Sequence, residues 1–332
     1  MNAPAFRFRF LLLAGLLPVF DAASAQTVEW WDPAAVAETR FSAFPFPGIT
    51  DVVATSRGIY SVGMTQCVND PAFFNVPKCK GLLVKHDAEG DRLWRKLLQD
   101  RDDTWITAVV ADDSGVYVHG TYRWYQQFPT YESFVHKYAH DGTLLWKFRD
   151  SEGNPDGYRI ARIRSQNLLL FDGFLYASSW RGRGSFLRKF TLDGELVWLA
   201  PAGAVGTLTA GDGYIFGSAG TNEGTQFETQ FQIWDTDGNL VDSFFTETIA
   251  ENGLAWHDGA LYFCAREGRY DRDYYSLNKM QPDGTPVWRI PYGRTAYGTQ
   301  GCGVHVDDGG VTVAVNLDLR RRATYPANLT VR

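Results

Sequence analysis

Short apolar runs separated by turn residues recur along most of the chain. Six segments combine an apolar run, a tight turn rich in Asp and Gly, and a second apolar run. They begin at Asp51, Thr107, Asn167, Gly206, Gly253 and Gly303. Short runs of this kind, often alternating, are typical of strands, and Gly or Asn supplies the positive φ that two-residue hairpin turns need. The pattern therefore predicts six antiparallel hairpins rather than helices.

A second repeated segment lies between these hairpins and carries a turn glycine that is followed by a Leu-Trp or Val-Trp pair in most copies. Its five copies read KHDAEGDRLW, KYAHDGTLLW, KFTLDGELVW, IWDTDGNLVD and KMQPDGTPVW. The turn glycines are Gly90, Gly142, Gly194, Gly238 and Gly284, at intervals of 44 to 52 residues. A period of this length is typical of propeller blades.

Six copies of the first segment and five of the second leave one unit incomplete. The two ends of the chain supply the missing strands, because residues 329–332 align with the strand before each outer turn and residues 27–31 resemble the strand after it. We therefore expect an all-β protein, a six-bladed β-propeller of four-stranded antiparallel blades. An N-terminal strand joins the C-terminal blade and closes the ring, which leaves no long free sheet edge.

The amino-acid sequence of the repeat also resembles that of a known family. SFVHKYAHDGTLLW and SFLRKFTLDGELVW resemble the bacterial SBBP-type β-propeller repeat, in which a strand enters a D-x-x-G or D-G turn and leaves through a Leu-Trp pair. The resemblance runs from about Gly81 to Trp288 and implies the propeller fold without implying an activity. We expect each Trp to bury apolar area between neighbouring blades. In the fourth copy Asp242 stands in the Trp position, which predicts weaker docking of that blade.

The N-terminus has the features of a targeting segment. Arg7 and Arg9 precede an apolar run over residues 10–20, and a small-residue site ends at Ala25. This order predicts a secretory signal peptide over residues 1–25, followed by a single propeller domain over residues 26–332. The apolar run is too short to cross a bilayer, so we expect no membrane span. The mature chain is expected to be a monomer, exported to the periplasm or the extracellular space.

Four cysteines are present, and export permits disulfides. Three pairings are possible, and we expect Cys67 with Cys79 and Cys264 with Cys302. The first two are close in sequence, and the blade alignment places the other two at the same height in adjacent blades. No C-x-x-C spacing occurs, so we expect no metal at these cysteines.

Long connections, between the second and third strands and between blades, are predicted to emerge on one face of the propeller. Aromatic and Arg residues gather in them. The candidate ligand-binding residues of these loops are Trp124, Tyr125, Trp180, Arg181, Arg183, Arg269, Tyr270 and Arg272. Planar rings and guanidinium groups suit a protein surface or a sugar. The alternative is that these loops stabilise only themselves through stacking and salt bridges.

The channel mouth is a second candidate site. The starts of the innermost strands are expected to bring polar and aromatic residues toward the axis. These residues are Asp51, Trp105, Arg164, Asn252 and Gln300. An Asp opposite an Arg there is equally compatible with a structural ion pair in a watery channel.

The charge and the motifs of the chain exclude several classes of function. The chain has 32 basic and 38 acidic residues, a net charge of -6 and no basic patch, so we expect no nucleic-acid partner. It also lacks the G-x-S-x-G, H-E-x-x-H and P-loop motifs. We therefore expect an exported, non-enzymatic binding or scaffold protein without a cofactor, whose partner is a protein or a cell-surface glycan.

The alternative function is an envelope or secreted enzyme with its site at the channel mouth. It would be carbohydrate-active, lactonase-like or quinoprotein-like. Quinoprotein dehydrogenases resemble this chain only in the repeated turn that ends in Trp.

Overall fold

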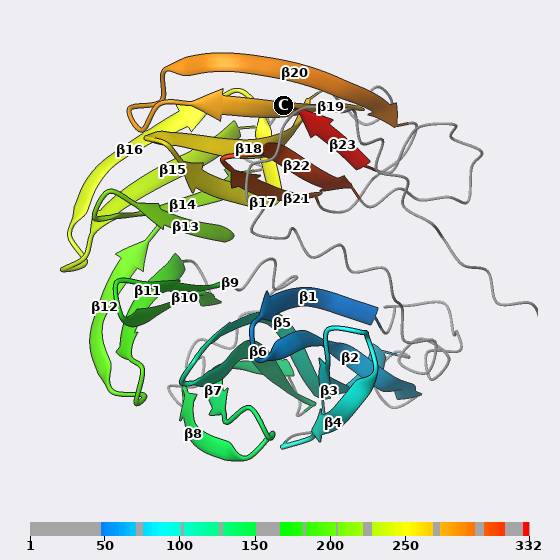
Figure 1. The fold of residues 1–332 in the computed structure, drawn as a ribbon. Coiled ribbons are helices and arrows are strands. Elements are labelled where there is room, and N and C mark those ends of the chain that lie inside the picture. Colours follow the sequence, from blue (N-terminus) through cyan, green and yellow to red (C-terminus); the bar gives the residue numbers. More distant parts are fainter. Residues whose placement is uncertain are drawn as a thin grey trace, which may run out of the picture.

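The described part of the chain forms six antiparallel β-sheets that stand side by side in the manner of propeller blades (Figure 1). The computed structural model describes residues 48–70, 76–100, 103–125, 129–150, 167–181, 184–203, 205–221, 228–267, 273–295, 302–315 and 328–331. Within these ranges every regular element is a strand, and no helix is long and apolar enough to cross a membrane.

We number the sheets as blades 1 to 6 in chain order. Blade 1 contains β1 (Gly48–Thr55), β2 (Gly58–Asp70), β3 (Val76–His86) and β4 (Arg92–Leu98), and blade 2 contains β5 (Asp103–Asp112), β6 (Gly115–Tyr125), β7 (Pro129–Tyr138) and β8 (Leu144–Arg149). Blade 3 contains β9 (Asn167–Phe171), β10 (Phe174–Arg181), β11 (Gly184–Thr191) and β12 (Leu196–Ala202), and blade 4 contains β13 (Thr207–Gly211), β14 (Tyr214–Thr221), β15 (Glu228–Asp235) and β16 (Leu240–Thr246).

Blade 5 contains β17 (Ile249–His257), β18 (Ala260–Glu267), β19 (Asp273–Met280) and β20 (Pro286–Thr295). The described part of blade 6 has three strands, β21 (Cys302–Asp307), β22 (Gly310–Val315) and β23 (Asn328–Val331). In every blade the strands pair in chain order, so each four-stranded sheet is a simple meander. The first strands contact one another in the order β1, β5, β9, β13, β17 and β21.

The predicted hairpins are present. The first and second strands of all six blades are joined by two-residue turns, and in blade 3 the turn residues Asp172 and Gly173 both have positive φ. Blades 4 and 5 repeat this at Asp212–Gly213 and Asp258–Gly259. Two positive φ angles match the strand twist in a tight hairpin, which explains why Asp and Gly recur there.

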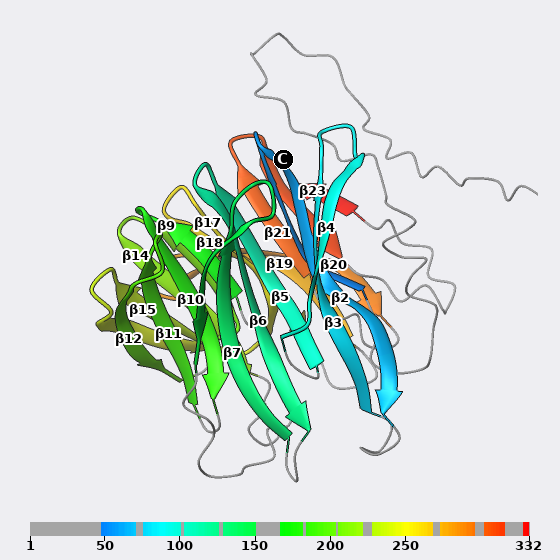
Figure 2. The ribbon, with the colours of Figure 1, turned by 90° about the horizontal axis from the view of Figure 1, so that it is seen from below.

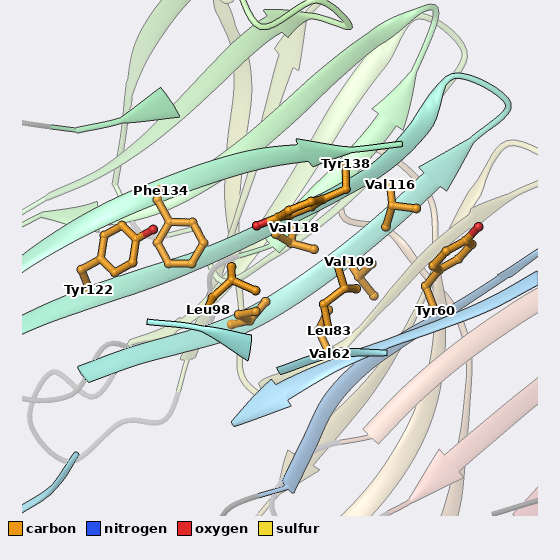
Figure 3. Close-up of a cluster of buried hydrophobic side chains, with 11 residues drawn as sticks. Tyr60, Val62, Leu83, Leu98, Val109, Val116, Val118, Tyr122, Phe134 and Tyr138 are labelled. Carbon is orange, nitrogen blue, oxygen red and sulfur yellow. The ribbon is translucent and has the colours of Figure 1, made fainter. Parts of the chain in front are cut away.

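The apolar core is divided among the seams between blades. Five clusters of buried side chains each join two consecutive blades. In the cluster between blades 1 and 2, Val62 and Leu83 meet Val109 and Val118 (Figure 3). Each sheet therefore buries its faces only by packing against its neighbours, as expected of a repeat architecture.

One polar arrangement recurs at these seams, and we call it the docking triad. It consists of a Tyr on the second strand, a Lys on the third and a Trp on the fourth. In blade 2, Lys137 Nζ lies 5.0 Å from the centre of the Tyr117 ring, and both Lys137 Nζ and Trp146 Nε1 donate hydrogen bonds of 3.0 Å to the carbonyl of Leu192 in blade 3. One main-chain carbonyl thus accepts two hydrogen bonds from the preceding blade, one from the Lys ammonium group and one from the Trp indole.

The same triad occurs in three other blades. Its members are Tyr60, Lys85 and Trp94 in blade 1, Tyr176, Lys189 and Trp198 in blade 3, and Tyr262, Lys279 and Trp288 in blade 5. In blades 1 and 3 the accepting carbonyls are those of His140 and Thr236, at distances of 2.8 to 3.1 Å. Each acceptor lies two residues before the turn glycine of the next blade.

Those glycines are required at the receiving turns. Gly194 has a φ of +93°, and a Cβ atom at this position would lie 2.6 Å from Cδ2 of Trp146. A Cβ atom at Gly238 would lie 2.9 Å from Trp198, whereas one at Gly142 would make an ordinary contact of 3.5 Å with Trp94. The indole therefore packs directly on the turn backbone, and the repeat couples Trp in one blade to Gly in the next.

Blade 4 departs from the triad at all three positions. Phe216, Ile233 and Asp242 occupy the Tyr, Lys and Trp positions, as the strand register shows. Docking is nevertheless kept, because Phe244, two residues further along β16, stacks on Phe231 and lies against Gly284 of blade 5. The seam after blade 4 is thus apolar. A side chain that the repeat alignment did not single out replaces the missing Trp.

One predicted disulfide is present, between Cys67 on β2 and Cys79 on β3. Cys264, buried at the seam between blades 5 and 6, is also disulfide-bonded. Its pairing with Cys302, at the start of β21, stays a prediction.

The docking geometry predicts a specific difference between two glycines of positive φ. We expect Gly194→Ala to lower the free energy of unfolding by about 1–3 kcal/mol more than Gly213→Ala, because only at 194 does the new methyl group meet an indole. Gly213 has a φ of +83° and open space around its Cβ position, so it carries the backbone strain alone. Urea unfolding of the two variants measures the difference. Equal losses would contradict the docking.

Candidate functional site

One end of the propeller carries hairpin arms, formed by the second and third strands where they continue past their neighbours (Figure 2). In blade 1, β2 runs on from Met64, its last pairing with β1, to Asp70, which pairs with Val76. In blade 2 the pairing of β6 with β7 continues to Tyr125. The opposite end has two-residue turns between the first and second strands and five-residue turns between the third and fourth strands in blades 1 and 2, so the two faces of the propeller differ.

The arm of blade 1 is braced by a covalent bond and by a buried carboxylate. The Cys67–Cys79 disulfide links its two strands, and the main-chain N–H of Cys79 donates to Oδ1 of Asp103 at 2.7 Å. Trp105 Nε1 donates to the same oxygen at 2.8 Å. Asp103 is fully buried at the start of β5, so it holds the arm of blade 1 against blade 2. Charge-assisted bonds of this kind are the strong ones.

A polar network, buried except at Asp100 and Arg149, lies at the seam between blades 1 and 2. Tyr122 Oη donates to Asp100 at 3.2 Å and lies 3.2 Å from Nε2 of His136, whose Nδ1 is 3.1 Å from the Tyr138 hydroxyl. Arg149 pairs with Asp100 and stands over the Tyr122 ring. Burial lowers the pKa of His136 to about 4 and raises the pKa values of both tyrosines. The network is therefore neutral apart from its ion pair.

The next seam repeats this layout with other residues. Arg188 occupies the repeat position of His136 and binds Asp150, which follows β8 as Asp100 follows β4, and also Ser179. His119 lies nearby with Nε2 3.0 Å from Ser133 Oγ. Burial, followed by the charge of Arg188, lowers the pKa of His119 to about 3. In both seams a buried polar side chain thus binds the Asp that follows the last strand of the preceding blade.

Among the predicted channel-mouth residues that the structure describes, Asp51 has a shifted pKa. Its carboxylate accepts hydrogen bonds from the N–H groups of Val52 at 2.9 Å and Val109 at 2.8 Å. Burial raises the pKa of Asp51 to about 6, although these two bonds oppose the shift. Both oxygens are engaged with backbone, so Asp51 ties β1 to β5. This is a structural use of the carboxylate.

The other predicted site residues fall in several places. Trp124 and Tyr125 end β6, and Trp180 and Arg181 end β10, so their backbones lie on the arms. Trp105 lies on β5 but at a different register from Asp51, because it pairs with Thr121 whereas Asp51 pairs with Val62. Asn252 is on β17. Arg164, Arg183, Arg269, Tyr270, Arg272 and Gln300 lie outside the described residues.

Sequence reasoning missed the buried polar residues of these two seams. The signal was present in the repeat, since SFVHKY and SFLRKF place His136 and Arg188 at the same position, directly before the triad Lys. Strand alternation makes that position buried, and a polar residue at a buried position implies a partner.

Across the described ranges no cluster of three or more His, Cys, Asp or Glu residues is placed to hold a metal ion.

Comparison with known proteins identifies the fold. No protein-family model and no curated protein matches the chain, so the resemblance to SBBP-type repeats rests on the repeat wording alone. Among solved structures, the Dos1 propeller matches with a TM-score of 0.51 and 13% identity, over 85% of this chain and 70% of that one. This likeness shows the fold, a β-propeller, and nothing about activity.

Two other propeller structures are more distantly similar. BamB from Moraxella catarrhalis matches with a TM-score of 0.39 and 13% identity, over 81% of this chain and 80% of that chain. The propeller domain of the trilobed protease from Pyrococcus furiosus matches with a TM-score of 0.44 and 12% identity, over 84% and 92% of the two chains.

Buried histidines predict how stability depends on pH. The folded-state pKa of His119 lies below its unfolded value of 6.5, so the folded state is favoured above pH 6.5 and loses this advantage as the pH falls toward about 3. The loss is about 1.4 kcal/mol per pH unit for one such group. Asp51 opposes it between pH 3.8 and about 6, because the folded state keeps its proton there.

Urea unfolding at a series of pH values tests this dependence. His119→Gln should flatten the slope between pH 6.5 and 4 by about one bound proton. The control is His305→Gln, at an exposed side chain on β21. An unchanged slope in the His119 variant would contradict the assignment.

Proposed function

We propose that this protein is an exported β-propeller that binds a partner protein through the arm-bearing face. The observation that carries the proposal is the bracing of the blade 1 arm by Cys67–Cys79 and Asp103. An ordinary connection needs neither a disulfide nor a buried carboxylate. A binding surface gains from both, because a rigid arm loses little conformational freedom when a partner docks.

The residue types on the arms support a protein partner. Backbone positions at the ends of β6 and β10 carry Trp124, Tyr125, Trp180 and Arg181. Trp, Tyr and Arg are the residues that most often dominate the binding energy of protein interfaces. A cell-surface glycan would use the same aromatic rings, so glycan binding is an outcome that the test distinguishes.

Export is supported by the disulfide chemistry. Cys67–Cys79 joins two strands of one arm, and structural disulfides persist in oxidising compartments such as the periplasm and the extracellular space. A signal peptide over residues 1–25 would deliver the chain there.

We further propose that the ring has six blades and is closed by residues 27–31 as the fourth strand of blade 6. The described part of that blade ends at β23, and the outer turn of blade 1 offers Gly90 with a φ of +93°, the same value as Gly194. Trp30 and Trp31 are then the residues available to dock at that turn.

Closure is tested by the double variant Trp30→Ala/Trp31→Ala. Loss of the closing indole should lower the midpoint of thermal unfolding by roughly 5 °C or more, since a buried Trp contributes several kcal/mol. The measurement is calorimetry of the mature chain. A variant that unfolds at the wild-type temperature would show that these residues do not close the ring.

The enzyme alternative has one feature to recommend it, the raised pKa of Asp51. Its two oxygens already accept main-chain N–H groups, however, so little of the carboxylate is available for proton transfer. The binding proposal is therefore preferred.

The binding face is tested by affinity purification from an envelope extract with purified protein as bait. We expect the triple variant Trp124→Ala/Trp180→Ala/Tyr270→Ala to lose a protein that the wild type retains. Tyr214→Ala is the control, because Tyr214 is an exposed aromatic residue at the opposite, tight-turn end of blade 4. Equal recovery with the triple variant would contradict the proposal. Retention of a polysaccharide instead would redirect it to a glycan.

A further inference from the structure

The outer rim of the propeller presents apolar side chains to solvent. On each fourth strand the residue before the Trp position is exposed. These residues are Leu93, Leu145, Val197, Val241 and Val287. Blade 4 exposes the most, because on β16 Leu240 is 51% exposed, Val241 53% and Phe245 58%. β16 is the outer edge of its sheet (Figure 1), so its backbone is also open on one side.

The other outer strands carry residues that discourage pairing with a further strand. β4 and β8 contain Lys and Arg, β12 contains Pro, and β20 contains both Arg and Pro. These residue types block the addition of a strand to an open sheet edge. β16, with the sequence LVDSFFT, has none of them. Its one charged residue, Asp242, accepts the N–H of Ser243 at 2.7 Å.

Charge is also distributed unevenly around this edge. Residues 190–265 contain eleven acidic residues and neither Lys nor Arg, and Lys189 of blade 3 supplies one cation to this region, at the Thr236 carbonyl before β16. Asp237, Asp242 and Glu247 are exposed beside or within β16. A single-sign charge of this kind attracts cationic partners and repels a second copy of the same surface.

From these observations we infer that β16 is a docking edge for an extended, cationic segment of a partner protein. The segment adds a fifth strand to blade 4. Its apolar side chains pack on the exposed Val241 and Phe245, and its Lys or Arg residues lie near Asp237, Asp242 and Glu247. Main-chain bonds supply affinity in this mode of recognition, and alternate side chains supply specificity.

The partner strand competes with one internal contact. The Ser243 N–H already donates to Asp242, so an incoming carbonyl must replace that carboxylate. A Lys or Arg on the incoming strand then pairs with the released Asp242. A segment with acidic residues cannot make this exchange, and this is the chemical basis for the predicted selectivity.

A synthetic peptide tests the inference. The probe is as long as β16 and alternates Val with Lys, and its binding to the mature protein is followed by fluorescence anisotropy at low ionic strength. We expect saturable binding that weakens as salt is added, whereas a peptide alternating Val with Glu should not bind. Hydrogen exchange should show new protection in residues 240–246 when the probe is bound.

Two variants locate the site. Phe245→Lys removes an exposed apolar contact and adds a like charge, and Ser243→Pro removes the N–H that the probe needs at an edge position where Pro is tolerated. Each should weaken probe binding about tenfold or more, a loss of about 1.4 kcal/mol or more. Leu145→Lys on β8, with a similarly exposed side chain, is the matched control and should leave binding unchanged.

The inference would be overturned by equal binding of the Val-Glu peptide. It would also be overturned by unchanged affinity in both β16 variants, or by sedimentation showing that β16 pairs with a second copy of the chain. None of these outcomes involves Trp124, Trp180 or Tyr270, so the docking edge and the arm-bearing face can fail separately.

Discussion

The main-chain carbonyl of the outer turn is the point on which the packing of blades 1 to 4 depends. A four-stranded blade has two apolar faces and can bury them only against its neighbours, so the angle between blades determines whether the core is filled. The Lys and Trp of one blade meet at a single carbonyl of the next, as Lys137 and Trp146 do at Leu192. A hydrogen bond from a charged donor contributes about 1.5–3 kcal/mol, so a repeated contact of this kind matters.

This constraint also explains which glycines and tyrosines recur. At Gly194 and Gly238 a Cβ atom would lie within 3 Å of the docked indole, so the contact favours glycine at these two turns. The triad Tyr presents its ring to the Lys cation, an attraction that grows as the pair is removed from water. The residues that recur in the sequence repeat are thus those that form one contact between neighbouring blades.

Blade 4 illustrates the consequence of losing this contact. With Ile233 and Asp242 at the Lys and Trp positions, the seam to blade 5 relies on Phe244 and its stacking on Phe231. The outer strand is then free of the basic residues that the repeat elsewhere places near it. The substitution at position 242 also adds an acidic residue to β16, an edge strand that contains no basic residue.

Much of the fold could be predicted from the residues. Asp-Gly pairs at the hairpin turns indicated the strand order because their positive φ angles are a local requirement, and Cys67 and Cys79 are close enough in sequence for their pairing to be inferred. The seams could not be predicted in the same way. Alternation shows that His136 and Arg188 are buried, but it does not show what faces them. Their partners, Asp100 and Asp150, come from the ends of preceding blades.

Some features of the candidate site could likewise be predicted from the sequence, and others could not. Placement of Trp124 and Trp180 on hairpin arms agrees with the expectation that these segments lie at one end. The role of Asp103 as a brace depends on a contact between blades 1 and 2 that no local pattern reveals. Phe244 was missed for a similar reason, because the repeat alignment points to position 242 and the structure uses the next residue on the same face.

Hydrogen exchange of the free protein, followed by mass spectrometry, is the most direct test of this account. It compares the five outer strands, which share one place in the sheet and differ in how they are docked. If Lys and Trp at the turn carbonyl hold the blades together, residues 240–246 of β16 should exchange fastest, and β4, β8 and β12, each with a complete triad bound to its carbonyl, should exchange slowest. Exchange from β16 that is no faster than from β4, β8 and β12 would contradict the account.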